Sequence, residues 1–314
     1  MSHSLPEHLH FLQRGWLSCN QILVTGGQGP VLIDSGHIGS VDETLQLLHQ
    51  QGVHPEDLQA LVTTHAHIDH FSANTVFREH SEAPLVCGEM TARLFAENDR
   101  RSMWISSVEV ARWDLDKHPP VQADRLLYPG EKVTLGAWEW EVLSAPGHAP
   151  DTLCFFQRDT GVLICADTMM VGDCGAMNVL VWPDAIEKAL ETLEVYKALP
   201  IRIALPGHGE PITNVAENIA KVETLLRGFQ AKPARLVQHL LARSFVFLLL
   251  TEAGGRSLTR NSAIEMFASL QHTQKYAPMA GTTPEEITTR LLDGFLLRGI
   301  IKENRGLLEI LVEP

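Results

Sequence analysis

Short apolar runs alternate with amphipathic stretches from residue 21 to about residue 215. Apolar runs bounded by turn residues predict β-strands, and stretches with a helical repeat predict α-helices. The predicted strands are Gln21–Thr25, Val31–Asp34, Leu61–Thr64, Leu85–Cys87, Leu153–Gln157, Val162–Ala166 and Ile201–Leu205, with a further pair within 131–143; the predicted helices are Val41–Gln51 and Pro183–Leu199. Because hairpins accompany the helices, this pattern is typical of a mixed α/β sandwich rather than a purely parallel sheet.

The pattern changes after residue 215, where long helical stretches follow one another. They are Ala216–Phe229, Ala234–Leu250, Leu258–Leu270 and a helix from the capping box at Thr283 to Gly299, followed by a hairpin around Asn304-Arg305-Gly306. Three helices and a terminal hairpin resemble a winged helix. We therefore expect a first domain over residues 1–231 and a helical, winged-helix-like C-terminal domain over residues 232–314, divided at Lys232-Pro233.

The segment between residues 98 and 120 admits two interpretations. Four of its side chains share one helical face, which indicates a helix that packs in the core or in a dimer: Trp104, Val108, Ala111 and Leu115. The alternative is a lid that presents Trp104, Trp113 or Arg101 to a substrate.

Composition is that of an ordinary soluble protein, with 45% hydrophobic and 20% charged residues. The longest tight apolar run, Phe245–Leu250, is far shorter than the roughly 20 residues that a membrane helix needs. The N-terminus has no basic and apolar signal pattern, and the five cysteines are scattered without a C-x-x-C pair. These features predict a cytoplasmic protein with reduced thiols and no membrane contact.

Charge bears on the choice of partner. The net charge is −13, and it is uneven, because residues 232–314 hold 10 basic and 8 acidic residues while the remainder carries −15. A negative field repels a phosphate backbone unless a basic patch overrides it. We therefore expect a small-molecule substrate rather than nucleic acid, and a C-terminal domain that packs, in a homodimer or over a pocket.

Four side chains that can bind metal follow the strand Leu61–Thr64, in the run His65-Ala66-His67-Ile68-Asp69-His70. At the end of a strand, His65 and His67 point to the same side because side chains alternate with a period of two. Asp69 and His70, on the turn that follows, can reach a second ion nearby.

Three further metal-competent residues come directly after predicted strands. His148 lies in Ala145-Pro-Gly-His, Asp167 ends the apolar run from Val162, and His208 lies in Leu205-Pro-Gly-His-Gly. Loops at the ends of strands commonly supply sites in α/β folds. Together with His65, His67, Asp69 and His70, these residues are the candidate metal ligands.

In their order along the chain, Asp34 and the seven candidate ligands resemble the metallo-β-lactamase superfamily, over roughly residues 10–215. The resemblance implies an αββα sandwich with two metal ions at one edge. One ion would take His65, His67 and His148, and the other would take Asp69, His70 and His208. Asp167 would bridge the two ions, and Asp34 would orient ligands without binding metal itself.

A pair of divalent ions lowers the pKa of a shared water and so supplies a hydroxide nucleophile, while Asp69 is expected to be catalytic by handling the leaving group and its proton. Imidazole and carboxylate ligands suit Zn²⁺ best here, and they also suit iron or manganese.

The bridging aspartate narrows the chemistry within the resemblance. Asp167 stands where the family's β-lactamases carry cysteine or serine, so antibiotic hydrolysis is not expected, and an aspartate there resembles glyoxalase II and lactonases. We expect a dinuclear metal-dependent hydrolase of a small ester, thioester or lactone. The alternatives are an endoribonuclease whose C-terminal domain holds RNA, a mononuclear iron persulfide dioxygenase, and a binding protein that senses a ligand.

Overall fold

A computed structural model describes residues 5–15, 17–105, 110, 113–253 and 258–311. The chain divides into two compact units, Met1–Glu223 and Thr224–Pro314. Helix α7 (Val215–Ala231) contributes residues to both units, and α8 (Pro233–Ala253) follows it. The domain boundary expected between residues 231 and 232 falls between these two helices and stays a prediction.

The first unit contains two sheets. The larger has the strand order β1-β2-β3-β4-β5-β6, with antiparallel pairs at β1–β2 and β2–β3 and parallel pairs from β3 to β6. Its strands are β1 (Leu9–Leu12), β2 (Gln21–Val24), β3 (Val31–Ile33), β4 (Ala60–Thr63), β5 (Leu85–Gly88) and β6 (Arg125–Leu127). Because β3, β4 and β5 run in parallel, their carboxyl ends meet at one edge.

The second sheet has the order β11-β10-β9-β8-β7, in which only β10 and β11 pair in parallel. Its strands are β7 (Lys132–Leu135), β8 (Trp138–Ser144), β9 (Leu153–Gln157), β10 (Val162–Ala166) and β11 (Ile203–Pro206). The hairpins predicted within 131–143 and around Asp159-Thr160-Gly161 are confirmed.

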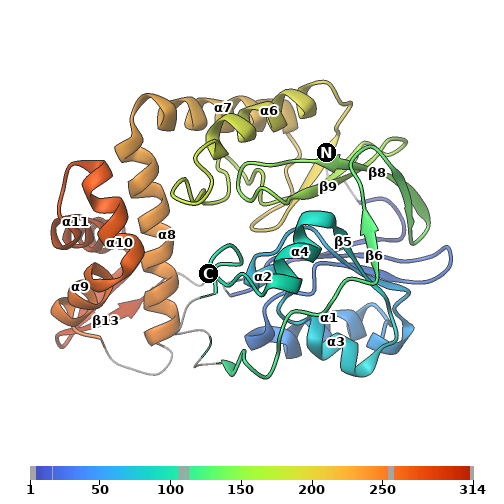
Figure 1. Ribbon diagram of the computed structural model, residues 1–314, viewed down its shortest axis with the longest axis horizontal. Coiled ribbons are helices and arrows are strands. Elements are labelled where there is room, and N and C mark those ends of the chain that lie inside the picture. Colours follow the sequence, from blue (N-terminus) through green and yellow to red (C-terminus); the bar gives the residue numbers. More distant parts are fainter. Residues whose placement is uncertain (1–4, 16, 106–109, 111–112, 254–257, 312–314) are drawn as a thin grey trace. The chain divides into compact units, whose positions relative to one another are not determined.

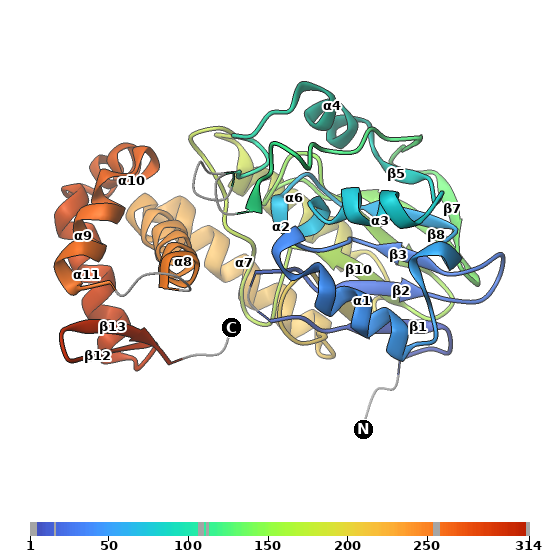
Figure 2. The same ribbon diagram turned by 90° about the horizontal axis from the view of Figure 1, so that it is seen from below.

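Helices cover the outer faces of the two sheets. In Figure 1, α1 (Val41–Gln50) and α3 (Asn74–His80) lie below the sheets, and α6 (Ala185–Lys197) lies above them. Seen from below in Figure 2, α1 and α3 lie in front of β2 and β3, with β10 behind. The unit also contains α2 (Ile68–Phe71), α4 (Glu89–Glu97) and the 3-10 helices η1 (Ile38–Ser40) and η2 (Pro55–Asp57). The αββα architecture is therefore confirmed.

Strand alternation explains how the sheets are held together. Ile22 and Val24 of β2 point inward, into a core that also contains Trp140 and Phe155 of the second sheet. Leu23, between them, points outward into a second core with Leu48 of α1. Side chains that are adjacent along the strand thus pack into two different cores, as the two-residue period of a strand requires.

The second unit is helical and ends in a hairpin. After α8 come α9 (Arg260–Ser269), α10 (Gln271–Tyr276), η3 (Ala277–Ala280), α11 (Pro284–Leu297), β12 (Ile301–Asn304) and β13 (Leu307–Ile310). The predicted capping box is present, because Glu286 N donates to Thr283 Oγ1 at 3.2 Å and Thr283 N donates to Glu286 Oε2 at 3.3 Å. The winged-helix identity stays a prediction.

The prediction of one helical face between residues 98 and 120 is wrong at Trp104, its first member. Trp104 lies in a turn with a left-handed backbone, at φ +59°, rather than in a helix. Leu115 is buried, as the core interpretation requires, whereas Val108 and Ala111 lie outside the described residues.

The five cysteines are free and buried. Within the described ranges, no helix combines the length and the apolar character that crossing a membrane would take. The cytoplasmic location stays a prediction.

Candidate metal centre

The carboxyl ends of strands from both sheets position the seven candidate ligands. Directly after β4 come His65 and His67, and α2 then carries Asp69 and His70. The other three come from the second sheet: His148 lies between β8 and β9, Asp167 follows β10, and His208 follows β11. The structure thus brings together all seven residues that the sequence indicated.

Three histidines form the first group. His67 Nδ1 lies 3.1 Å from His65 Nε2 and 2.7 Å from His148 Nε2. The three rings are buried, and their facing nitrogen atoms lie within 4.8 Å of one another. Three imidazole nitrogens that converge in this way match the ligand type and number of a zinc site.

Hydrogen bonds on the far side of two rings decide which nitrogen faces inward. His65 Nδ1 donates to Thr64 Oγ1 at 3.0 Å, and His148 Nδ1 donates to the Ala176 carbonyl at 2.7 Å. Burial, reinforced by the neighbouring histidines, lowers the pKa of His65, and burial likewise lowers that of His148. The Nε2 atoms of His65 and His148 therefore carry no proton and direct their lone pairs into the group, which is the form in which imidazole binds a metal ion.

Asp69, His70 and His208 form the second group, which also lies within 4.8 Å. His208 Nε2 is 3.0 Å from Asp69 Oδ2, and His70 Nε2 is 3.9 Å from the same oxygen. Asp167 lies between the two groups: its carboxylate oxygens are 3.4 Å from His70 Nε2, 3.4 Å from His208 Nε2 and 3.5 Å from His148 Nε2.

Two buried atoms at the centre of this arrangement have no hydrogen-bond partner among the described residues. They are His70 Nε2 and Asp167 Oδ1. A buried polar atom without a partner costs about 1–3 kcal/mol, so such atoms are rare unless a ligand satisfies them. Both belong to the residues expected to bind a second ion, and this donor set fits one.

Opposite charges in and beside the second group stabilise each other. Burial lowers the pKa of His208, but the carboxylates of Asp167 and Asp69 outweigh burial and raise it to about 10. Conversely, burial raises the pKa of Asp167, but His208 and His70 hold it well below its usual value. The buried carboxylates thus depend on positive charge nearby, which protons on the histidines supply in the metal-free chain and a divalent ion would supply in their place.

Asp34 organises ligands from beneath the site, as expected. Its carboxylate accepts from His70 Nδ1 at 2.8 Å, from Thr64 N at 2.8 Å and from Thr64 Oγ1 at 2.9 Å. Since Thr64 in turn accepts from His65, one carboxylate orients a histidine in each group. A metal-binding histidine commonly donates its second N–H to such a partner.

The local backbone conformation directs the Asp167 side chain into the site. The β10–β11 register shifts between Ile164 and Ala166, and Ala166 has a φ of +45°. Gly207 allows this approach, because a Cβ there would overlap Asp167 Oδ1. The Pro-Gly-His run at His208 therefore needs a glycine, because a larger residue would clash with the Asp167 side chain.

Asp151 is a supporting residue that the sequence analysis missed. Its Oδ2 accepts from Ala66 N at 2.8 Å and from Thr91 Oγ1 at 2.7 Å, so it fixes the peptide between His65 and His67. In the sequence, only the closeness of Asp151 to His148 could have indicated this supporting role.

Cys19 also lies against His70 and Asp34, within 4.8 Å. Burial raises the pKa of this thiol to about 12, so it stays protonated, and His70 Nδ1 already donates to Asp34. Cys19 is therefore not counted among the candidate ligands.

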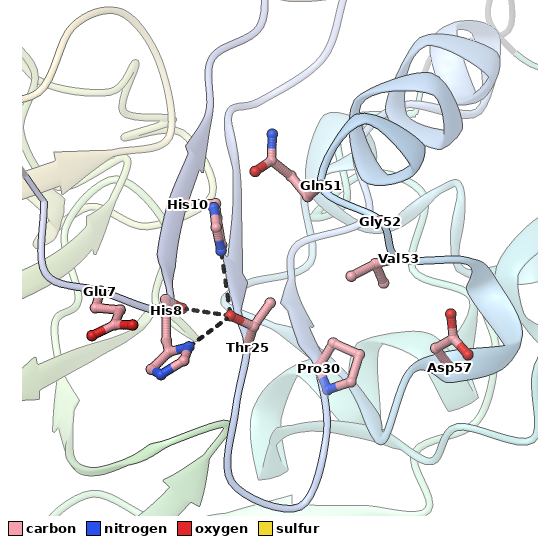
Figure 3. A pocket seen from close by; sticks show the side chains of 9 residues that line it. All are labelled: Glu7, His8, His10, Thr25, Pro30, Gln51, Gly52, Val53 and Asp57. Atoms are coloured by element: carbon pink, nitrogen blue, oxygen red, sulfur yellow. Dashed lines mark hydrogen bonds between the residues drawn. The ribbon is translucent and has the colours of Figure 1, made fainter.

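An open pocket of about 700 Å³ lies elsewhere, at the ends of β2 and β3 that are remote from the candidate ligands. Figure 3 shows that His8 and His10 point toward Thr25, whose Oγ1 lies 3.4 Å from His8 Nδ1 and 3.3 Å from His10 Nε2. None of the seven candidate ligands lines it.

Known proteins resemble the chain in both sequence and fold. It is 28% identical to the acyl-coenzyme A thioesterase MBLAC2 of Gallus gallus, over 59% of this chain and 70% of that protein. It is 23% identical to the hydroxyacylglutathione hydrolase GloC of Haemophilus influenzae, over 58% of this chain and 81% of that protein. A crystal structure of a metallo-beta-lactamase family protein from Thermus thermophilus shares the fold, with a TM-score of 0.61, 19% identity, and coverage of 98% of this chain and 100% of that one.

The sequence profile of the metallo-beta-lactamase superfamily matches residues 14–208, a range that contains all seven candidate ligands and Asp34. Members of this superfamily use divalent metal ions, typically zinc, and the matched relatives are named as hydrolases. The chain is therefore a metal-dependent hydrolase that belongs to the metallo-beta-lactamase superfamily.

Proposed function

We propose that this protein is a dinuclear metal-dependent hydrolase of small thioesters, esters or lactones. One ion would be held by His65, His67 and His148, and the other by Asp69, His70 and His208. The observation that carries the proposal is the position of Asp167, whose two oxygens lie 3.4–3.5 Å from histidines of both groups. A carboxylate between two ligand sets is what a bridged pair of ions requires.

Divalent ions supply two effects at such a site, polarisation of a carbonyl oxygen and a lowered pKa for water. The chain contributes the proton chemistry through Asp69. Burial raises the pKa of Asp69, but His70 and His208 outweigh burial and lower it, so its carboxylate is ionised and would hold a proton only transiently, for transfer to the leaving group. The side chains of Asp69 and His208 are 24% and 35% exposed, whereas His70 is fully buried. Asp69 thus lies on the open side, where a leaving group can take the proton from it.

Thioesters are the substrate class that the comparisons favour. The two relatives named above act, by their names, on acyl-coenzyme A and hydroxyacylglutathione. Both substrates join an acyl group to a thiol, and a thiolate is a good leaving group that needs little protonation. We therefore place thioesters before esters and lactones in order of expected turnover.

The test begins with metal content, measured on full-length protein purified without added metal. Close to two equivalents of zinc or manganese per chain supports the proposal. One equivalent of iron favours persulfide oxidation instead, and an absence of metal even after reconstitution contradicts the ligand assignment.

Activity is then measured on a panel of an acyl-coenzyme A, an acylglutathione, a simple ester and a lactone. Asp69→Ala should abolish turnover while the circular dichroism spectrum stays that of the wild type. Asp184→Ala is the matched control, since Asp184 is an exposed carboxylate that precedes α6 without capping it. Full turnover by Asp69→Ala would contradict the catalytic assignment, and persistent ligand binding without turnover in the wild type would favour a binding protein.

A further inference from the structure

One buried histidine of the site lacks the support that the others have. On the side away from the ligand groups, His65 is bonded to Thr64, His148 to the Ala176 carbonyl and His70 to Asp34. His67 directs Nδ1 toward His65 and His148, and among the described residues its Nε2 has no hydrogen-bond partner. On its far side, therefore, no hydrogen bond fixes the orientation of this ring.

The indole of Trp104 covers that ring. The centroids of Trp104 and His67 are 4.7 Å apart at an interplanar angle of 31°, a tilted stacking contact. The next histidine, His148, is farther from Trp104, at 5.8 Å and 58°. Trp104 is half-buried, so its contact with His67 is a packed one.

The backbone around Trp104 is built to hold this contact. Trp104 has a φ of +59°, a left-handed conformation that a bulky residue adopts only under constraint. The preceding residue, Met103, is fully buried, and its carbonyl accepts from Ile68 N at 3.1 Å. Because Ile68 directly follows His67, the turn that carries the indole is tied to the backbone of the histidine that it covers. Ile105 N closes the turn by donating to the Arg100 carbonyl at 2.8 Å.

We infer that Trp104 is a positioning residue for His67 and holds the imidazole by stacking where the other histidines are held by hydrogen bonds. The inference rests on the proposed function, because it takes His67 as a metal ligand. A ring that donates its lone pair to a cation loses electron density, and the electron-rich face of an indole attracts such a ring more strongly than a neutral one. Trp104 should therefore favour the metal-bound form of His67 over the free form.

The experiment measures zinc affinity of the full-length, metal-free chain by competition with a chromophoric chelator. Trp104→Leu keeps an apolar side chain but removes the aromatic face, and we expect a loss of about tenfold in affinity, the lower end for a supporting partner of a ligand. Trp104→Phe keeps an aromatic face and should recover most of that loss.

The matched control is Trp113→Leu, in the same segment. Trp113 packs edge-on against His37 at 4.5 Å, and His37 is not a candidate ligand, so zinc affinity should be unchanged. Tryptophan fluorescence supplies a second readout: zinc should change the emission of the wild type, and most of that change should be missing from Trp104→Phe.

The inference is overturned if Trp104→Leu binds zinc as tightly as the wild type, if Trp113→Leu is weakened equally, or if Trp104→Phe keeps the full fluorescence change. If Trp104→Leu fails to fold, the fluorescence of Trp104→Phe decides. A wild-type chain that binds neither zinc nor manganese overturns both this inference and the proposed function. A wild-type chain that binds zinc, beside an unaffected Trp104→Leu, overturns this inference alone.

Discussion

Asp34 shows how much of the site depends on one carboxylate that is not among the seven candidate ligands. It accepts three hydrogen bonds, from His70 and twice from Thr64, and it adopts a φ of +59°. Aspartate and asparagine tolerate this left-handed region better than most residues. Aspartate therefore suits this position for two reasons: it tolerates the left-handed backbone, and its carboxylate offers two acceptor oxygens.

Asp34→Asn should weaken metal binding while leaving the backbone in place. The amide keeps one acceptor oxygen but presents N–H groups to either His70 Nδ1 or Thr64, so one orienting bond is lost. We expect zinc affinity to fall about 10- to 100-fold, as measured by chelator competition. The exposed variant Asp184→Asn serves as the control, and equal affinities for Asp34→Asn and the wild type would contradict the orienting role.

At the residue scale, the sequence predicted candidate ligands where side chains that can bind metal directly follow the end of a predicted strand. His65, His67, Asp69 and His70 follow one strand within a few residues, and all four are residue types that can bind metal, so the prediction needed only local reasoning. Trp104 and Asp151 could not be assigned their contacts. Asp151 reaches Ala66 across 85 positions, and a left-handed backbone at Trp104 is contrary to the preference of its residue type.

Among the elements, the connection between β8 and β9 links the two sheets at the site. Asp151 lies in this connection, and its carboxylate accepts from Ala66 in the turn after β4 and from Thr91 in α4. All three residues are buried. The turn that carries His65 and His67 is therefore fixed by a partner from the other sheet.

Asp151→Ala should destabilise the first unit by about 2 kcal/mol, because Ala66 N–H and the Thr91 hydroxyl lose their buried acceptor. The measurement is urea unfolding followed by tryptophan fluorescence, which reports on the first unit because all six tryptophans precede residue 224. Asp151→Asn retains an acceptor and should lose less. An unchanged midpoint for Asp151→Ala would show that water replaces the carboxylate.

In the second unit, His272 of α10 makes stability depend on pH. Burial lowers the pKa of His272 to about 4, and its ring packs against Phe267. The unfolded chain therefore binds a proton more readily between about pH 6.5 and pH 4, and the second unit should lose stability as the pH falls through this window.

His272→Leu should remove this dependence. Thermal unfolding followed by helical circular dichroism, compared at pH 7 and pH 5, should show a smaller drop in midpoint for His272→Leu than for the wild type. The fluorescence transition of the first unit is the internal control and should not differ between the two proteins. An identical drop in both proteins would mean that another group titrates.

Elements with a strong local signal were predicted to within a few residues, among them β9 and β10, whose apolar runs are buried throughout, and α11, which begins at a capping box. The sequence pattern did not predict β1, β6, α2, α3, α4 and α10. These are short, or mostly exposed like the strand of Arg125 and Leu126, so their boundaries are set by packing against the sheet rather than by a local pattern.

For the whole molecule, net charge gives a prediction about nucleic acid. With a charge of −13, the chain should repel a phosphate backbone, and the C-terminal residues carry too small a positive excess to overcome this. We expect no binding of a labelled RNA oligonucleotide at low salt by fluorescence anisotropy. Binding that rises as salt falls, and is lost on removal of residues 232–314, would instead favour the endoribonuclease alternative.

The seven candidate ligands are divided between the sheets, four after β4 and three from the second sheet. Ions bound there would connect the two sheets of the sandwich to each other. An ion that binds the folded chain alone adds about 4 kcal/mol when its free concentration is 1,000 times its dissociation constant. A cell starved of metal would then lose more than catalysis: the empty chain would open more often at this edge, reach proteases sooner and be cleared faster, so the abundance of the protein would follow the metal supply.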